Sequence, residues 1–296
     1  MTAKRLLVLA ALLAFAAPPG LDAQTPVTRA QLRPPDSGYV QVLRLRDGSQ
    51  HIGRIREVTD SAITFETNVA TIRIPIANIR SLDETPESRL RGGQYWFPTP
   101  QASRLFFAPT ARMLAAGEGY FADHWLFFPS VAFGVTDRVT IGGGMSIFPG
   151  TDLGNQFMFL TPKVGLPSPP GLQLAAGALV IRVPEEGPES FLTGILYGVG
   201  TVGREDASLT IGLGYGFVES DVANRPMVMV GADARISRRV ALVTENWILP
   251  GVEEPIVSYG LRIMGEKLSV DIAFVTWLGE DMLFPGIPLL GAAVGF

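Results

Sequence analysis

The chain has 296 residues, with 24 basic and 28 acidic side chains and a formal net charge of −4. This near balance, without any basic block, lacks the electrostatic footprint of a nucleic-acid-binding protein, so we expect no nucleic-acid partner. The sequence contains no cysteine, which excludes disulfides, thiolate metal sites and a lipoprotein cysteine.

The N-terminus has the pattern of a secretory signal peptide. Lys4 and Arg5 precede an apolar run over residues 6–15, and Ala23 ends a plausible cleavage site, so we predict a signal peptide over residues 1–23. An uncleaved anchor is the alternative, but the run is about half the ~20 residues that a membrane helix needs. Residues 24–38 hold three prolines and are predicted to form a flexible leader.

Residues 39–83 predict a small all-β domain. An Asp47-Gly48 turn between alternating runs is a strong hairpin signal. Together with Gly53 and the Ile74-Pro75 ending, the pattern resembles an SH3-like or Sm-like five-stranded small barrel, which we expect in the periplasm. The five strands are expected at 40–45, 51–55, 62–66, 70–74 and 76–82. The polar residues 84–103 are predicted to form a linker.

The region 104–296 predicts a transmembrane antiparallel β-barrel. In residues 208–217 one face carries Leu209, Ile211 and Leu213, and the other carries only serine, threonine and glycine. Barrels in membranes alternate in this way, with apolar residues toward lipid and small or polar residues toward the interior. A soluble periplasmic β-protein is the alternative, but its exposed face would carry many charges, which here gather in the turns.

Twelve strands are expected in this barrel, an even number as in bacterial single-chain barrels. They are placed at 104–115, 125–136, 139–148, 155–166, 171–183, 190–202, 207–218, 225–237, 240–250, 255–265, 268–277 and 288–296. Tight turns alternate with longer acidic loops, so both barrel ends and the tight turns are expected on the periplasmic side. Glu245 alternates in phase with Val243 and Trp247, which leaves open a rim position or a bulge that shifts the register.

Two further stretches carry a resemblance to outer-membrane proteins. Residues 291–296 form an alternating strand that ends in Phe296, which resembles the signal presented to the barrel-assembly machinery. Residues 104–111, followed by residues 117–121, resemble an opening of uncharacterised bacterial outer-membrane β-barrel proteins. The resemblance implies an outer-membrane location, contact with outer-membrane lipid and assembly through Phe296, and it implies no activity.

Catalytic and metal-binding patterns are weak. His51 and His124 are the only histidines, which excludes a histidine metal cluster. The acidic loops lack a spaced calcium-binding pattern, and exposed acidic loops are usually solvated. A phospholipase barrel would need a serine next to His124, and no nucleophile motif surrounds a serine. We therefore expect no catalytic residue, no enzyme activity, no metal and no cofactor.

Five charged side chains are predicted to line the barrel interior: Lys163, Asp233, Arg235, Arg262 and Asp271. If Glu266-Lys267 forms a two-residue turn, the hairpin places Arg262 directly opposite Asp271. Opposite charges across a strand pair stabilise a sheet by ~1 kcal/mol or less. The pair can be a structural ion pair or a constriction of a pore.

Two functions remain open from the sequence. Twelve strands enclose an interior between the filled eight-stranded and the open sixteen-stranded barrels, which favours a small passive pore or a small-solute binding barrel. The alternative is a non-conducting structural protein anchored in the outer membrane, whose small domain recruits a periplasmic protein through an exposed strand edge.

Overall fold

The chain folds into two compact units that divide between Phe97 and Pro98. The computed structural model describes residues 27–185, 189–279 and 284–296. The expected signal peptide, residues 1–23, lies outside these residues. Among the described residues, none belongs to a helix with the length and apolar character needed to cross a membrane.

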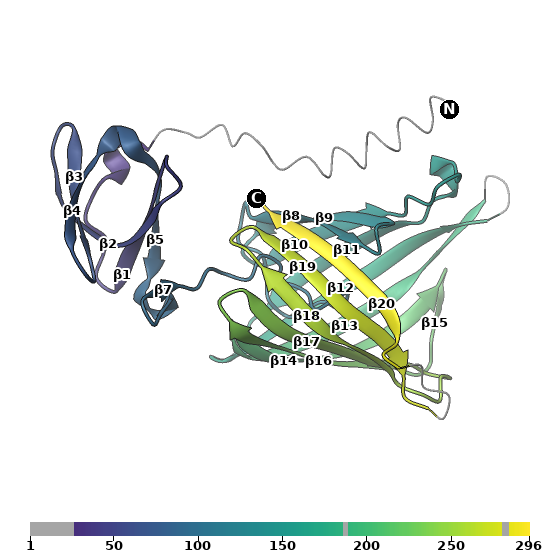
Figure 1. Cartoon of the computed structure of the whole chain (residues 1–296). Helices are drawn as coiled ribbons and strands as arrows, with labels where there is room; N and C mark the ends of the chain where they lie inside the picture. The colour runs from purple at the N-terminus through teal and green to yellow at the C-terminus, as the bar shows by residue number, and fades with distance from the viewer. Residues whose placement is uncertain (1–26, 186–188, 280–283) are drawn as a thin grey trace. The chain divides into compact units, whose positions relative to one another are not determined.

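The first unit contains the five strands that the sequence predicts. They are β1 (Tyr39–Leu45), β2 (Gln50–Val58), β3 (Ala62–Thr67), β4 (Thr71–Pro75) and β5 (Ile79–Pro86). They form one antiparallel sheet in the order β4-β3-β2-β1-β5 (Figure 1). Alternation buries Leu43, Ile55 and Phe65 in a common core, which is what a sheet with one apolar face requires. Gly53 is needed in β2 because a Cβ there would lie 1.9 Å from the carbonyl oxygen of Glu66.

The first unit extends beyond the predicted domain at both ends. Residues 27–38, expected as a flexible leader, include the 3-10 turn η1 (Arg29–Gln31), and Leu32 is buried against the core of the sheet. The expected fifth strand begins with another 3-10 turn, η2 (Ile76–Asn78). After β5, the turn η3 (Glu87–Arg89) and the short hairpin of β6 (Leu90–Arg91) and β7 (Gln94–Tyr95) occupy part of the expected linker.

The second unit is a closed antiparallel barrel of twelve strands, as the sequence predicts. The wall strands are β8 (Gly119–His124), β9 (Phe128–Thr136), β10 (Val139–Met145), β11 (Met158–Leu166), β12 (Leu172–Pro184), β13 (Ser190–Arg204), β14 (Ala207–Val218), β16 (Met227–Ser237), β17 (Val240–Ile248), β18 (Ile256–Met264), β19 (Leu268–Trp277) and β20 (Ile287–Gly295). Each pairs with its neighbours in the chain, and β8 pairs with β20 to close the ring (Figure 1). Two short elements, η4 (Leu153–Asn155) and β15 (Asp221–Val222), extend the loops.

The outer surface of the barrel is apolar. In β14, Leu209, Ile211 and Leu213 are between 42% and 55% exposed, whereas Ser208 and Thr210 on the alternate face are buried. Large exposed apolar side chains recur on the other wall strands except β12, whose apolar side chains are half-buried or buried. Such a band faces lipid in transmembrane barrels, and it is the reverse of a soluble sheet.

The chain enters the first wall strand and leaves the last one at the same rim of the barrel, the rim that carries the tight turns. The amide of Phe296 donates to the carbonyl of Gly119 over 2.9 Å, and the amide of Gly295 donates to that of Lys267 in a tight turn over 2.7 Å. The Phe296 ring packs on Phe121 with centroids 5.0 Å apart. The structure therefore confirms the expectation that an even number of strands places both chain ends on the same side as the tight turns.

The predicted first strand, residues 104–115, is wrong. The first wall strand is β8, and the predicted segment has only an isolated bridge between Arg104 and Pro109. The physical reason is that Pro109 cannot donate to a sheet ladder and that the consecutive residues 105–107 are all apolar, without alternation. The segment instead fills the interior of the barrel.

Candidate functional site in the barrel interior

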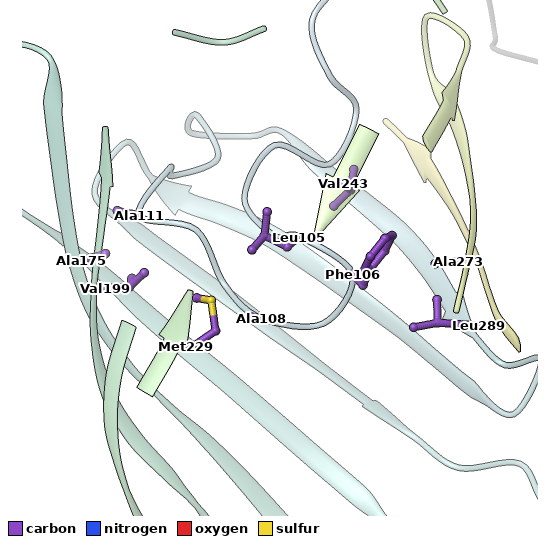
Figure 2. Packing of buried hydrophobic residues seen from close by; sticks show 10 residues of the cluster. All are labelled: Leu105, Phe106, Ala108, Ala111, Ala175, Val199, Met229, Val243, Ala273 and Leu289. Carbon is purple, nitrogen blue, oxygen red and sulfur yellow. The ribbon is translucent and has the colours of Figure 1, made fainter. Parts of the chain in front are cut away.

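Residues 101–116, named here the inner segment, run through the barrel. Leu105 and Phe106 are at most 1% exposed and pack against wall residues. Figure 2 shows the loop that carries Leu105, Phe106 and Ala108 crossing between the strands. Their apolar neighbours from the wall are Ala175, Val199, Met229, Val243, Ala273 and Leu289. The missing side chain of Gly231 leaves room for Leu105, because a Cβ at Gly231 would lie 2.2 Å from Leu105 Cδ1.

Glu245 fixes the middle of the inner segment. Its Oε2 accepts hydrogen bonds from the amides of Phe107 and Ala108, both over 2.9 Å, and its Oε1 accepts one from Trp247 Nε1 over 2.9 Å. Both alternatives left open by the sequence are wrong, because Glu245 faces inward and the pairing of β17 with both neighbours is continuous from Ala241 to Trp247. The register shift between β16 and β17 lies away from Glu245, at Arg235 and Ser237. Val243 and Trp247 face inward with it and pack against the inner segment, which supplies the apolar contacts that lipid would otherwise supply.

Arg262 and Asp271 form a buried ion pair that also holds the inner segment. They pair across β18 and β19 in the register that the hairpin predicts. Arg262 donates Nε to Oδ1 over 2.7 Å and Nη2 to Oδ2 over 3.1 Å, a bidentate geometry. Arg262 Nη2 also donates to the carbonyl of Leu105 over 2.6 Å, and Gln101 Nε2 donates to Asp271 Oδ2 over 3.0 Å. The pair is structural in this arrangement.

Lys163 binds the inner segment through carbonyl oxygens. Its Nζ donates to Ser103, Thr110 and Arg112 over 3.1, 2.9 and 2.7 Å. An ammonium group has three protons, so these three acceptors use all of its donors. Lys163 therefore clamps two stretches of the inner segment against β11.

Asp233 and Arg235 lie apart from the other three predicted residues. Both face inward on β16, close to the tight turns. Asp233 accepts a hydrogen bond from Ser208 Oγ, and Arg235 lies 3.5 Å from a carboxylate oxygen of Asp206. These contacts join wall and turn residues. The structure thus brings Lys163, Arg262 and Asp271 together around the inner segment and leaves Asp233 and Arg235 near the rim.

Arg104 and His124 are interior residues that the sequence did not identify. Arg104 is 7% exposed and His124 8%. Arg104 Nη1 donates to the carbonyl of Phe106 over 2.5 Å and lies 2.9 Å from His124 Nε2, and Nη2 donates to Gln101 Oε1. Pro109 is the sequence signal that could have identified Arg104 as an interior residue. A proline argues against a wall strand over residues 104–115.

A cavity of about 230 Å³ lies between the inner segment and the wall. Its walls are largely apolar. The rings of Phe107, Phe159 and Trp247 line it together with Ile195 and Met227. Arg104, His124, Lys163 and Tyr197 supply polar groups at its surface. A concave, mostly apolar space with few polar groups is the general form of a small-molecule site.

Three aromatic residues with a polar ring atom or hydroxyl face the interior of the barrel. Tyr120 is buried with its hydroxyl 3.1 Å from Ser103 Oγ, and Tyr197 and Trp247 line the cavity.

Across residues 27–185, 189–279 and 284–296, no group of three or more His, Asp or Glu side chains could hold a metal ion. His124 contacts Arg104 through its ring nitrogens and stacks 4.7 Å from the Phe107 ring.

Similarity to known proteins is found among solved structures. No family model and no curated protein matches the sequence. The NanC porin is 7% identical, with a TM-score of 0.39 and 60% of this chain and 97% of that chain covered. A loop-deletion mutant of the outer-membrane protein OmpT of Vibrio cholerae is 12% identical, with a TM-score of 0.33 and 87% and 96% covered. Omp33 of Acinetobacter baumannii is 8% identical, with a TM-score of 0.34 and 60% and 95% covered.

Proposed function

We propose that this protein is an outer-membrane β-barrel that binds a small, largely apolar solute inside the barrel, rather than an open passive pore. The observation that carries the proposal is the cavity between the inner segment and the wall, with Trp247, Phe159 and Met227 among its lining residues. An open aqueous pore would present polar side chains along the whole interior.

The inner segment supports this choice. Glu245, Lys163 and Arg262 each hydrogen-bond to its backbone. Charge-assisted hydrogen bonds of this kind are stronger than neutral ones, and breaking one leaves a buried group without a partner. The segment is therefore a built part of the interior, and the space beside it suits a bound molecule.

The apolar band and the shared position of both barrel ends support the outer-membrane location. We further propose that the tight turns and the unit of residues 27–97 face the periplasm, and that the strand ending in Phe296 is read by the barrel-assembly machinery. The SH3-like identity of the first unit belongs to this proposal. Cell envelopes carrying the full chain should release it only with detergent, and its unheated form should migrate differently from its boiled form in SDS electrophoresis.

Binding is tested by quenching of Trp247 fluorescence with a chain-brominated octanol, using the full chain in lipid nanodiscs. Bromine quenches tryptophan at close contact, so binding in the cavity should dim Trp247. The variant Trp247→Phe separates this signal from that of tryptophans exposed to lipid. Gly212→Leu is the matched cavity-filling variant, since Gly212 lines the cavity and its nearest neighbour is the flexible end of Met229. Equal quenching in all three proteins would contradict the proposal.

The second candidate is a non-conducting structural anchor, and the filling of the interior by Leu105 and Phe106 favours it. Its partner would be a protein that adds a strand to β4 or β5, the two edge strands of the small sheet. An anchor would neither quench specifically nor conduct in a planar bilayer. A steady ohmic conductance of the full chain would instead support a passive pore and contradict both candidates.

A further inference from the structure

The charges that line the cavity all have one sign. Arg104 and Lys163 are cations, and among the described residues that line the cavity none is an aspartate or a glutamate. The nearby buried carboxylates are engaged elsewhere. Glu245 accepts from two backbone amides and Trp247, and Asp271 accepts from Arg262 and Gln101. The charged side chains at the cavity surface are therefore cations, and the nearest carboxylates are bonded to other donors.

Arg104 retains an unused donor. It is 7% exposed, and its Nε has no hydrogen-bond partner in the described part of the chain. No ion pair joins Arg104 to a described carboxylate, and its other two nitrogens bind neutral oxygens or lie against His124. A buried donor left unsatisfied is costly, and more so on a charged group. An acidic ligand group beside the guanidinium would compensate this charge.

The remaining wall requires an apolar body. Phe159, Leu179, Ile195, Met227 and Trp247 line the same cavity. Burial of a hydrocarbon against them is favourable in proportion to the area removed from water. Lys163 uses its three protons on backbone carbonyls, which leaves the Arg104 guanidinium as the lining cation available to a ligand. One cation suits a single negative charge better than the two of a phosphate monoester.

We propose that the cavity binds an organic carboxylic acid with an apolar body, of medium chain length or aromatic, with its carboxylate at Arg104 and its body against Met227 and Trp247. This inference rests on the proposed binding function and names the class of solute. Arg104 and Lys163 together select the acid over neutral and cationic analogues, because a like charge repels and a neutral group forms a weaker hydrogen bond.

The test compares three chain-brominated probes of equal length: the octanoate, the octanol and the octylamine. Each is titrated against the full chain in nanodiscs of zwitterionic lipid, and the part of the quenching that Trp247→Phe removes is measured. We expect the acid to act at about tenfold lower concentration than the alcohol, since one charge-assisted hydrogen bond accounts for that ratio. The amine should be the weakest of the three.

Arg104→Gln should abolish the preference for the acid over the alcohol, so that the two probes act at similar concentrations. Arg138→Gln is the matched control, because it removes one positive charge from an exposed turn. The heat-dependent mobility shift shows that each variant is folded, and if Arg104→Gln lacks it, the ranking of the three probes on the native chain decides. Equal affinity for acid and alcohol, or tightest binding of the amine, overturns the carboxylate assignment and leaves the binding function standing. Absence of specific quenching by all three overturns the binding function itself.

Discussion

The small sheet and the large barrel use the same period-two alternation with opposite results. In the sheet, Leu43, Ile63 and Phe65 are fully buried. In the barrel, Leu209, Ile211 and Leu213 are exposed, while Glu245 and Asp271 are 1% exposed. The solvent on the outer face explains the difference, because water excludes the apolar face of a sheet and lipid accepts it.

Because the two units bury different kinds of side chain, different interactions stabilise them. The sheet is held by its apolar core, so truncation of that core should dominate its stability. The barrel interior is held by charged groups bound to backbone amides and carbonyls of the inner segment. Loss of one such charge should dominate there, because its partner stays buried.

The largest effect is expected from Asp271→Ala. This change leaves the Arg262 guanidinium buried without its bidentate partner, which costs about 3–5 kcal/mol. Unfolding of the barrel by guanidinium chloride in detergent, followed by tryptophan fluorescence, measures the loss. The double variant Arg262→Met with Asp271→Leu is the control and should lose much less. If the single and double variants lose the same stability, the ion pair does not hold the interior.

The next effect contrasts the same truncation in both units. Ile63→Ala should destabilise the small sheet by about 2–5 kcal/mol, because it opens a cavity in a fully buried core. Ile211→Ala should change the barrel far less, since lipid fills the space beside a lipid-facing residue. Hydrogen exchange measured by peptide reports the two units separately in the full chain. Similar losses at both positions would contradict the assignment of the outer face.

A charge on the outer face sharpens the contrast. Ile211→Arg should cost about 2–4 kcal/mol if this position lies near the bilayer midplane. The refolding yield into lipid vesicles, read from the heat-dependent mobility shift across a denaturant series, measures it. The control is Val69→Arg at an 86% exposed position of the small unit, which should stay within about 0.5 kcal/mol of the native chain. Equal tolerance of both changes would indicate that water, not lipid, covers the barrel.

The smallest effect is expected from Glu245→Gln. The neutral amide keeps the shape of the side chain but weakens the hydrogen bonds to the amides of Phe107 and Ala108, at a cost of about 1–3 kcal/mol. Exchange of these two amides should become faster, while amides of the neighbouring wall strand stay protected. Thr244→Ser on the outward side of β17 is the control and should leave exchange of both amides unchanged. Unaltered exchange in Glu245→Gln would show that the segment is held by packing alone.

Much of the architecture follows from local pattern. The alternation around Leu209 and Thr210 gives the strand type and its two faces, and the spacing of turns gives eleven of the twelve wall strands. The expected twelfth, residues 104–115, stands in place of β8. The Glu266-Lys267 turn sets the register that pairs Arg262 with Asp271, because a two-residue turn leaves no freedom in a hairpin. The five strands of the small unit follow from the same reasoning, including the Asp47-Gly48 turn, where Gly48 adopts a φ of 87°.

The candidate site was predicted only in part. Lys163 could be placed on the inward face from alternation, but its partners could not, since they are carbonyls of a segment 51 to 60 residues earlier in the chain. Arg104 was assigned to a wall strand, which concealed its role in the interior. Val243 and Trp247 looked like lipid-facing residues because an apolar side chain has the same sequence signal whether it meets lipid or a buried chain segment.

The sequence by itself therefore determined two β units, eleven of the twelve wall strands and the register of the last hairpin, because these depend on neighbours along the chain. The tertiary structure decided which segment closes the ring and which fills it. Ring closure pairs β8 with β20, at opposite ends of the unit, and leaves residues 101–116 to the interior. There the backbone partners of Glu245, Lys163 and Arg262 come from a segment distant in the sequence, so no local sequence pattern predicts these partners.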